Sequence, residues 1–290
     1  SLAPGGGANA VANVMALGGR PLPLGIVGDD DSGRELLAAL AARGIPTEAI
    51  LVRAGYRTPT KTRILAGFPT GIKQQVVRLD REQEIVLEAA EMEALRAAIG
   101  RLGGARAAIL SDYGYGSVAP ALLPAVRQAL GAHGAIIVDS RFRLGEFAGL
   151  DGATPNEEEA EALLERRLDD AAGSDLDAGR ELRERLGARF LLITRGSRGM
   201  SLFLREGAAH VPVHGTDQVA DVTGAGDTVI GTFALALAAG GTPLEAMVLA
   251  NYAGGVVVMK MGTATVSAEE LTAAISSDPR PRLEMTWVGS

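Results

Sequence analysis

The segment DVTGAGDT at residues 221–228 combines a glycine-rich turn with a carboxylate, directly before an apolar stretch. Gly224, Ala225 and Gly226 leave their backbone N–H groups unobstructed, and at a helix start such groups attract an anion together with the helix dipole. Asp227 would stand beside that anion, where a carboxylate is repelled unless it has a task such as accepting a proton from an attacking hydroxyl. A glycine turn followed by an ordinary N-terminal Asp explains the same spacing, which leaves both interpretations open. The helix dipole alone predicts that Asp227 is ionised.

A second polar segment, TPNEEE at residues 154–159, lies at a predicted strand end. Asn156 and Glu159 match the capping box of a helix N-terminus, in which each side chain bonds the backbone N–H of the other residue. The same two side chains suit the orientation of a hydrated Mg²⁺ and of nucleotide phosphates. The spacing favours the cap, and both roles are compatible.

Two further segments suit a polar or anionic small molecule. The glycines of PGGGAN at residues 4–9 let a ligand approach the backbone closely, and Asn9 offers two-sided hydrogen bonding to a polyol. A tight turn explains the glycine run by itself, and for the run alone it is the favoured interpretation. A predicted hairpin carries four cations: Lys61, Arg63, Lys73 and Arg78. They would either grip an anionic substrate or protect an edge strand by charge.

Several classes of protein are excluded by what the 290 residues lack. No Lys directly follows a Gly, which excludes a phosphate-binding loop of the Gly-Lys-Ser/Thr type, and no GxGxxG follows a strand. Zero Cys and three His exclude a cysteine-based zinc site. The net charge of −7 argues against a nucleic-acid partner, and no apolar window suits a membrane span. No signal peptide is visible, so we expect a cytoplasmic protein.

The elements that must position these residues alternate along the chain. Apolar runs of strand length occupy residues 22–27, 107–111, 135–139 and 190–194, and helical patterns occupy 31–43, 90–102, 119–132, 157–167, 177–187, 225–240 and 243–260. This alternation predicts an α/β fold with a mostly parallel sheet covered by helices on both faces. Residues 60–66 and 73–80 have period-two patterning and predict an antiparallel hairpin, a small flap over the sheet. Polar residues follow the strands, where an open α/β sheet binds its ligands.

In this order the motifs resemble those of the ribokinase-like (PfkB) family of sugar kinases. The GGxxN segment, the TPNxxE segment, the ITRG strand end and DVTGAGDT each have a counterpart there, and the last is the most specific. The resemblance extends over nearly the whole chain. Within the family, residues 60–81, 111–116 (SDYGYG) and 261–267 are similar to the heptose 7-phosphate kinases.

The resemblance implies one ribokinase-like domain over residues 1–290, with flap strands at about 49–80. The N-terminal strand of the family has no counterpart here, so we expect N-terminal sequence to be missing before Ser1. The implied reaction transfers the γ-phosphate of ATP to the anomeric hydroxyl of D-glycero-β-D-manno-heptose 7-phosphate, with Mg²⁺ as cofactor. The partner is then a small-molecule sugar phosphate, and a homodimer is a further candidate because flap strands of this family commonly build dimers.

The resemblance also implies a role for each candidate residue. Asp227 would be the catalytic base, and Gly224, Ala225 and Gly226 would form the anion hole. The ATP and Mg²⁺ site would comprise Asn156, Glu157, Glu158, Glu159, Thr194, Gly196 and Asn251, with Glu159 holding the metal through water. The sugar phosphate would face Gly5, Gly6, Asn9, Arg63, Gln75, Arg78 and Asp112.

Two other functions stay open. Another kinase of the same fold would act on ribose, a keto-deoxy sugar acid or a nucleoside. A non-catalytic relative would bind a nucleotide or a sugar without transferring phosphate. Two positions on the acceptor side differ from the heptose kinases: Tyr115 stands in place of Lys, and Asp139-Ser140-Arg141 in place of Asp-Pro-Lys. Asp227 favours an enzyme, because binding alone does not need that carboxylate.

Overall fold

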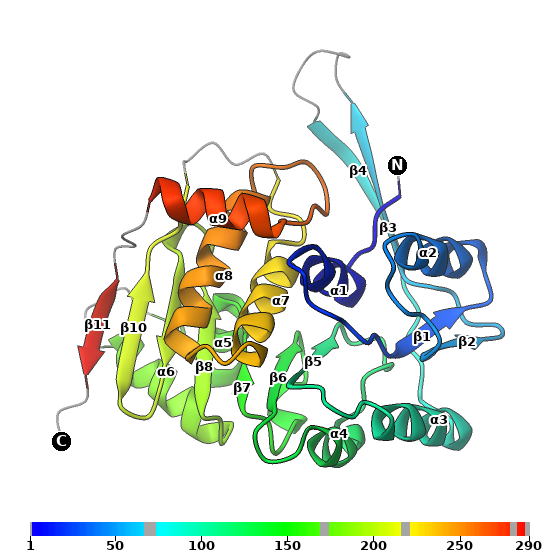
Figure 1. Ribbon diagram of the computed structural model, residues 1–290, viewed down its shortest axis with the longest axis horizontal. Coiled ribbons are helices and arrows are strands. Elements are labelled where there is room, and N and C mark those ends of the chain that lie inside the picture. The colour runs from blue at the N-terminus through cyan, green and yellow to red at the C-terminus, as the bar shows by residue number, and fades with distance from the viewer. Residues whose placement is uncertain (1, 67–73, 169–173, 216–220, 279–282, 288–290) are drawn as a thin grey trace.

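The computed structural model describes residues 2–66, 74–168, 174–215, 221–278 and 283–287, and Figure 1 shows their arrangement. Its larger sheet has seven strands in the order β11-β10-β9-β8-β7-β6-β5. Four of them are parallel: β5 (Ala107–Asp112), β6 (Ala135–Ser140), β7 (Gly152–Ala153) and β8 (Phe190–Thr194). Three antiparallel strands extend the sheet: β9 (Met200–Phe203), β10 (Gly207–Val211) and β11 (Glu284–Trp287). The predicted α/β class is confirmed, although the sequence analysis did not predict the antiparallel extension.

Helices cover both faces of this sheet (Figure 1). One face packs against α1 (Gly7–Ala16), α7 (Ala225–Ala238) and α8 (Pro243–Val257), and α9 (Ala268–Ser277) lies on α8. The other face packs against α3 (Ala89–Gly100), α4 (Leu123–Leu130), α5 (Glu157–Leu164) and α6 (Ser174–Arg185). No helix in the described ranges is long and apolar enough to cross a membrane.

The strand residues alternate between the two faces, as period-two geometry requires. On β6, Ile136 and Val138 belong to the core under α3 to α6, whereas Ile137 belongs to the core under α7 and α8. All three side chains are fully buried, and burying an aliphatic side chain of this size contributes about 1.5–3 kcal/mol. The apolar runs predicted from the sequence are therefore strands that serve two cores at once.

The N-terminal third forms two smaller sheets beside the large one (Figure 1). β1 (Gly25–Gly28) and β2 (Ile50–Arg53) pair in parallel around α2 (Asp31–Ala41), whereas β3 (Thr60–Ala66) and β4 (Gln74–Arg81) form the antiparallel hairpin. The flap was expected to begin at about residue 49, but β2 pairs with β1 instead. Lys73 and the turn that joins the hairpin strands lie outside the described residues.

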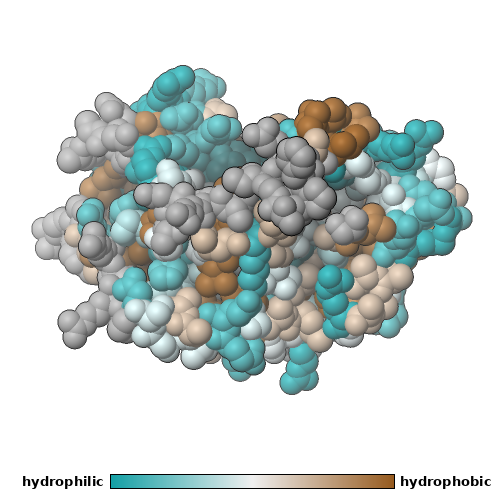
Figure 2. Space-filling view, turned by 90° about the horizontal axis from the view of Figure 1, so that it is seen from above, coloured by the Kyte–Doolittle hydropathy of each residue, from teal (hydrophilic) through white to brown (hydrophobic). Residues whose placement is uncertain are grey.

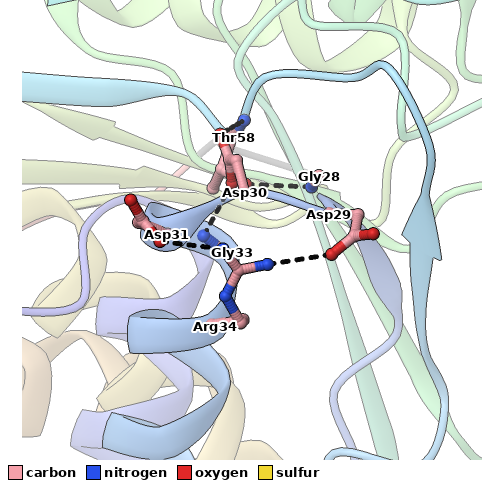
Figure 3. A network of polar contacts seen from close by, with 7 residues as sticks. All are labelled: Gly28, Asp29, Asp30, Asp31, Gly33, Arg34 and Thr58. Atoms are coloured by element: carbon pink, nitrogen blue, oxygen red, sulfur yellow. Dashed lines mark hydrogen bonds and ion pairs between the residues drawn. The ribbon is translucent and has the colours of Figure 1, made fainter.

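Asp30 joins α2 to the base of the hairpin (Figure 3). Its Oδ1 caps the helix by accepting from the backbone N–H of Gly33 (2.8 Å) and also accepts from the Thr58 hydroxyl (2.7 Å). Its Oδ2 accepts from the Thr58 backbone N–H (3.0 Å), and the Thr58 hydroxyl in turn accepts from the Gly28 N–H (2.9 Å). Burial raises the pKa of Asp30, but these hydrogen bonds outweigh it and lower the pKa below its ordinary value.

Candidate active site

The start of α7 is built around Gly224, whose positive φ of 78° is a conformation that favours glycine. A Cβ at this position would lie 2.5 Å from Nδ2 of Asn9, so a side chain would also push Asn9 away. With glycine there, Nδ2 of Asn9 donates to the Gly224 carbonyl (3.2 Å) and to Oδ2 of Asp227 (3.1 Å). The two glycine-rich motifs, more than two hundred residues apart, thus meet at one carboxylate.

Asp227 is 6% exposed, and its Oδ1 accepts a hydrogen bond from the hydroxyl of Tyr113 (2.5 Å). Burial raises the pKa of Asp227 to about 6, and the hydrogen bonds from Tyr113 and Asn9 oppose that rise. The helix dipole favours the ionised form of Asp227, and the loss of hydration at this site acts against it. At pH 7 the carboxylate is still mostly ionised.

A cavity of about 200 Å³ opens at the carboxyl ends of β5, β6, β7 and β8, beside Asp227. It is lined by Asp112, Tyr113, Asp139, Arg141, Thr154, Asn156, Glu159, Thr194, Gly226 and Val229. The hydroxyl of Thr154 is buried there and has no hydrogen-bond partner among the described residues. A buried polar group without a partner costs free energy, so a ligand oxygen in the cavity would stabilise the site.

Carboxyl groups dominate the charge of the cavity. Burial, followed by the charges of Glu159, Asp227 and Asp112, raises the pKa of Asp139 to about 7. Burial also raises the pKa of Glu159, against a lowering by its capping bond and by the charge of Arg141. In the described part of the chain, no three acidic or histidine side chains converge to hold a metal by themselves. The oxygen donors therefore fit a magnesium ion that keeps several waters and uses ligand oxygens as well.

The capping box at the start of α5 is confirmed. Oδ1 of Asn156 accepts from the Glu159 N–H (2.9 Å), and Oε2 of Glu159 accepts from the Asn156 N–H (2.9 Å). The neighbouring strand end lies alongside, because the N–H of Thr194 donates to the carbonyl of Pro155 (3.1 Å). These three predicted nucleotide-site residues line the same cavity.

The other residues predicted for the nucleotide have different surroundings. Glu157 pairs with Arg195 (3.1 Å) and with Arg198, which ties α5 to the loop after β8. Gly196 lies in that loop with a positive φ of 57°, and Glu158 is exposed. Asn251 is buried in α8, where its Nδ2 donates to the carbonyl of Pro212 (2.9 Å), and it is not part of the cavity lining.

On the acceptor side, the structure brings the N-terminal glycines and Asp112 close to Tyr113. Gly5 is exposed, and Gly6 is the N-cap of α1 beside the Tyr113 ring. Asp112 is buried, and its carboxylate accepts from the hydroxyl of Ser140 (2.8 Å) and from two guanidinium nitrogens of Arg143 (2.9 and 3.2 Å). Asp112 therefore lines the cavity, but its hydrogen bonds are made with groups of the protein itself.

The remaining acceptor candidates lie on the hairpin. Arg63 of β3 stands directly opposite Arg78 of β4, and Gln75 is exposed further along β4. Arg78 donates twice to Asp80 (2.8 and 2.6 Å), and Lys61 also pairs with Asp80 (3.2 Å). Arg63 has no hydrogen-bond or ion-pair partner among the described residues, although its charge acts on the carboxylate of Asp221 without a direct contact. Its N–H groups could therefore bind a further anion.

Four polar residues that line the cavity were not among the predicted site residues: Tyr113, Asp139, Arg141 and Thr154. Each lies at or just after a strand end, and that position was the available signal. The recognised motifs are glycine turns and helix starts, which are visible in a few consecutive residues. These cavity residues come together only because the strands that they follow lie side by side in the sheet.

Comparison with known proteins places the chain in a family. The profile of pfkB family carbohydrate kinases matches residues 1–271. The chain is 38% identical over 276 residues to the bifunctional protein HldE of Pelobacter propionicus, and 42% identical over 274 residues to that of Caulobacter sp. strain K31. These matches cover 94% and 92% of this chain but 55% and 54% of the relatives, so the chain spans about half the length of the curated relatives it matches.

Solved structures share the fold at lower identity. Phosphofructokinase-2 from Escherichia coli, in complex with potassium, matches with a TM-score of 0.77 at 20% identity, over 95% of this chain and 87% of that chain. A ribokinase from Arabidopsis thaliana, complexed with ribose and ATP, matches with a TM-score of 0.71 at 20% identity, over 92% and 86% of the two chains. The ribokinase-like fold is thereby confirmed. Since the family profile matches most of its residues, the chain belongs to the pfkB family of carbohydrate kinases.

Proposed function

We propose that this chain transfers the γ-phosphate of ATP to the anomeric hydroxyl of D-glycero-β-D-manno-heptose 7-phosphate, with Asp227 as the proton acceptor. The observation that carries the proposal is a buried carboxylate at the start of α7, beside a cavity built from strand ends. Family membership supports a sugar hydroxyl as acceptor, and the identity to proteins named HldE supports a heptose.

The chemistry assigns one task to each group near Asp227. As the acceptor oxygen attacks the γ-phosphorus, its proton passes to Asp227, and the bond between the γ-phosphorus and the bridging oxygen of ADP breaks. A pKa near 6 suits this task, because the carboxylate is ionised at neutral pH and is more basic than an exposed aspartate. Gly224, Ala225 and Gly226 would form the anion hole for the transferred group, with Gly226 in the lining of the cavity.

The nucleotide would occupy the side of the cavity formed by the end of β8 and the start of α5. Mg²⁺ bound there would neutralise charge on the phosphates, and Glu159 would hold it through water. The buried hydroxyl of Thr154 supports an oxygen-rich ligand at this position, because it has no partner among the described residues. The proposed ATP-side residues are Asn156, Glu157, Glu158, Glu159, Thr194, Gly196 and Asn251.

An anionic acceptor is supported by the hairpin. Like charges directly opposite each other destabilise a strand pair unless counter-charges are present, and Asp80 supplies a counter-charge to Arg78. A phosphate on the sugar would accept hydrogen bonds from Arg63, whose charge acts on Asp221 without a direct contact. The proposed acceptor-side residues are Gly5, Gly6, Asn9, Arg63, Gln75, Arg78 and Asp112.

The test is an ADP-release assay with Mg·ATP across a sugar panel. The panel contains the heptose 7-phosphate, ribose, fructose 6-phosphate, a keto-deoxy sugar acid and a nucleoside, each also assayed with Asp227→Asn. We expect turnover on the heptose phosphate, a loss of about 10²–10⁴-fold in the variant, and retained ATP binding measured by calorimetry.

Each other result rejects a defined part of the proposal. Turnover on a different sugar keeps the phosphotransfer and rejects the heptose. ATP binding without turnover on any sugar supports a non-catalytic binding relative. Near-normal turnover by Asp227→Asn would show that Asp227 is not the proton acceptor.

The hairpin also supports the homodimer as a proposal. Ile64 and Val77 face each other across the strands and are 47% and 42% exposed, and Leu79 on the same face is 53% exposed. Figure 2 shows hydrophobic side chains gathered at the upper right of the face from which the hairpin projects. An apolar patch on an exposed hairpin is typical of a surface that binds another chain, and a second copy would bury it.

A further inference from the structure

Both carboxylate oxygens of Asp227 are already bonded within the protein. Oδ2 accepts from Asn9 (3.1 Å), and Oδ1 accepts from the hydroxyl of Tyr113 (2.5 Å). Tyr113 also lines the cavity, so the residue that donates to Asp227 belongs to the wall of the candidate site. Asn9 belongs to the glycine-rich motif and Tyr113 to the SDYGYG segment at residues 111–116, but the sequence predicted no role for Tyr113.

We propose that Tyr113 is a positioning residue for Asp227, whose phenolic O–H fixes the orientation of the carboxylate and holds it in the ionised form. The inference rests on the proposed function, since it presumes that Asp227 accepts the proton. It adds a residue that sets the pH range of the reaction without exchanging a proton itself.

The ring of Tyr113 is held by groups that leave it little freedom. A Cβ at Gly6 would lie 3.1 Å from Cε2 of the ring, so the glycine provides the space that the ring occupies. On the other side, the N–H of Gly114 donates to Asp112 (3.1 Å), and Asp112 is itself fixed by Arg143. A buried ion pair therefore anchors the loop from which Tyr113 reaches the carboxylate.

The charge around the pair makes Tyr113 a donor and not a base. Burial, followed by the negative charge of Asp227, raises the pKa of Tyr113 far above its ordinary value, so the phenol keeps its proton. Its hydrogen bond stabilises the charged form of Asp227 and so opposes the effect of burial on the pKa of Asp227.

Other charged groups face Asp227 from the neighbouring elements. Asp139 at the end of β6 is close enough for the charge of Asp227 to raise its pKa, and Asp112, Glu159 and Arg141 line the same cavity. None of these groups donates to Asp227 in the described structure. Tyr113 and Asn9 are therefore the two neighbours whose removal changes the hydrogen bonding of the carboxylate directly.

The same loop supplies a matched control. Tyr115 lies two residues further on, and its hydroxyl donates to Oε1 of Glu82 (2.6 Å) at the end of the hairpin. Tyr115→Phe removes an identical hydroxyl from the same loop without touching Asp227. If loss of a hydroxyl from this loop acts only on the structure, both variants should shift the acidic limb of the pH profile. If it acts on the Asp227 carboxylate, only Tyr113→Phe should shift it.

The experiment is the pH profile of kcat/KM for the wild type, Tyr113→Phe and Tyr115→Phe with the sugar that turns over. We expect the acidic limb of the wild type near pH 6, and in Tyr113→Phe we expect it about one pH unit higher. The loss of kcat/KM in Tyr113→Phe relative to the wild type is then about fivefold larger at pH 6 than at pH 8. Tyr115→Phe should keep the acidic limb of the wild type.

An acidic limb of Tyr113→Phe that coincides with the wild type would overturn the inference, as would an equal shift in Tyr115→Phe. If Tyr113→Phe does not fold, site-specific 3-fluorotyrosine at position 113 keeps the ring and makes the phenol a stronger donor. The limb should then move to lower pH, and an unmoved limb would reject the inference. The proposed function fails separately, through an active Asp227→Asn.

Discussion

At the start of α7, polar groups are buried and bonded to residues from distant parts of the chain, whereas on the β3–β4 hairpin they are exposed and bonded to near neighbours. Asp227 and Asn9 are 6% and 1% exposed and lie 218 residues apart in sequence. On the hairpin, Arg78 bonds Asp80 two residues away. In the proposed function both regions bind the same acceptor, but one is fixed by the core and the other by its own strands.

The difference indicates how the two regions would contribute to function. A buried carboxylate cannot relax toward water, so its orientation and pKa are set in advance, as a proton acceptor requires. Exposed cations keep most of their hydration and contribute little to stability, so they can exchange one counter-ion for another when a ligand arrives. Substitutions should therefore affect stability near the cavity and substrate affinity on the hairpin.

The largest expected effect on stability comes from Arg143→Met. Asp112 has a side chain that is 1% exposed, and the change leaves its charge without a partner. We expect a loss of about 3 kcal/mol in the free energy of unfolding, at the lower end for a broken buried pair because Arg143 is 30% exposed. Urea denaturation followed by circular dichroism measures it.

The double variant Asp112→Asn with Arg143→Met is the matched control. It removes the uncompensated charge, so it should recover more than half of the stability lost in the single variant. If Arg143→Met is as stable as the wild type, the charges beside the cavity contribute no more to stability than those of the hairpin. The contrast drawn between the two regions would then be wrong.

An intermediate effect is expected at the junction between the two regions. Asp30→Ala removes the cap of α2 and both bonds to Thr58, which should cost about 1–2 kcal/mol in the free energy of unfolding. Because the folded pKa of Asp30 lies below the unfolded value of 3.8, its contribution is present above pH 3.8 and is lost as the pH falls further. The deficit of the variant should therefore shrink below that pH.

The neighbouring Asp29 provides the control for this measurement (Figure 3). Its exposed pair with Arg34 (2.9 Å) should contribute nothing measurable, so Asp29→Ala should unfold like the wild type. Equal deficits in the two variants, or a deficit of Asp30→Ala that persists unchanged at low pH, would contradict the role given to the Asp30 network.

The smallest effects on stability are expected on the hairpin itself. Arg63→Ala and Arg78→Ala should leave the unfolding midpoint unchanged, because both side chains are exposed. For a phosphorylated acceptor, Arg63→Ala should raise KM about 10–100-fold, and Arg78→Ala should raise it less because Asp80 already neutralises Arg78. Steady-state kinetics with phosphorylated and unphosphorylated sugars measures these changes. Equal increases in KM for both sugars would show that Arg63 does not contact the phosphate.

Much of the fold was predictable because its strands are local patterns. The run at 190–194 appears as β8 with the same bounds, and the apolar runs before Asp112 and Asp139 appear as β5 and β6 within one residue. For β7 the sequence predicted only a strand end at Thr154 and no strand range, because its two residues are too short for periodicity to show. The partner of β2 was not predicted either, because pairing between strands is decided by packing across the chain and not by either sequence alone.

The sequence by itself determined the turn at Gly224, the capping box at Asn156 and Glu159, and the kind of site to look for. Each of these depends on a few consecutive residues, whose backbone geometry is dictated by residue type and spacing. Only the tertiary structure placed the hydroxyl of Tyr113 on Asp227 and, through burial, raised the pKa of that carboxyl. Hydration and hydrogen bonding of a buried charge depend on every element packed around it, and no local segment contains that information.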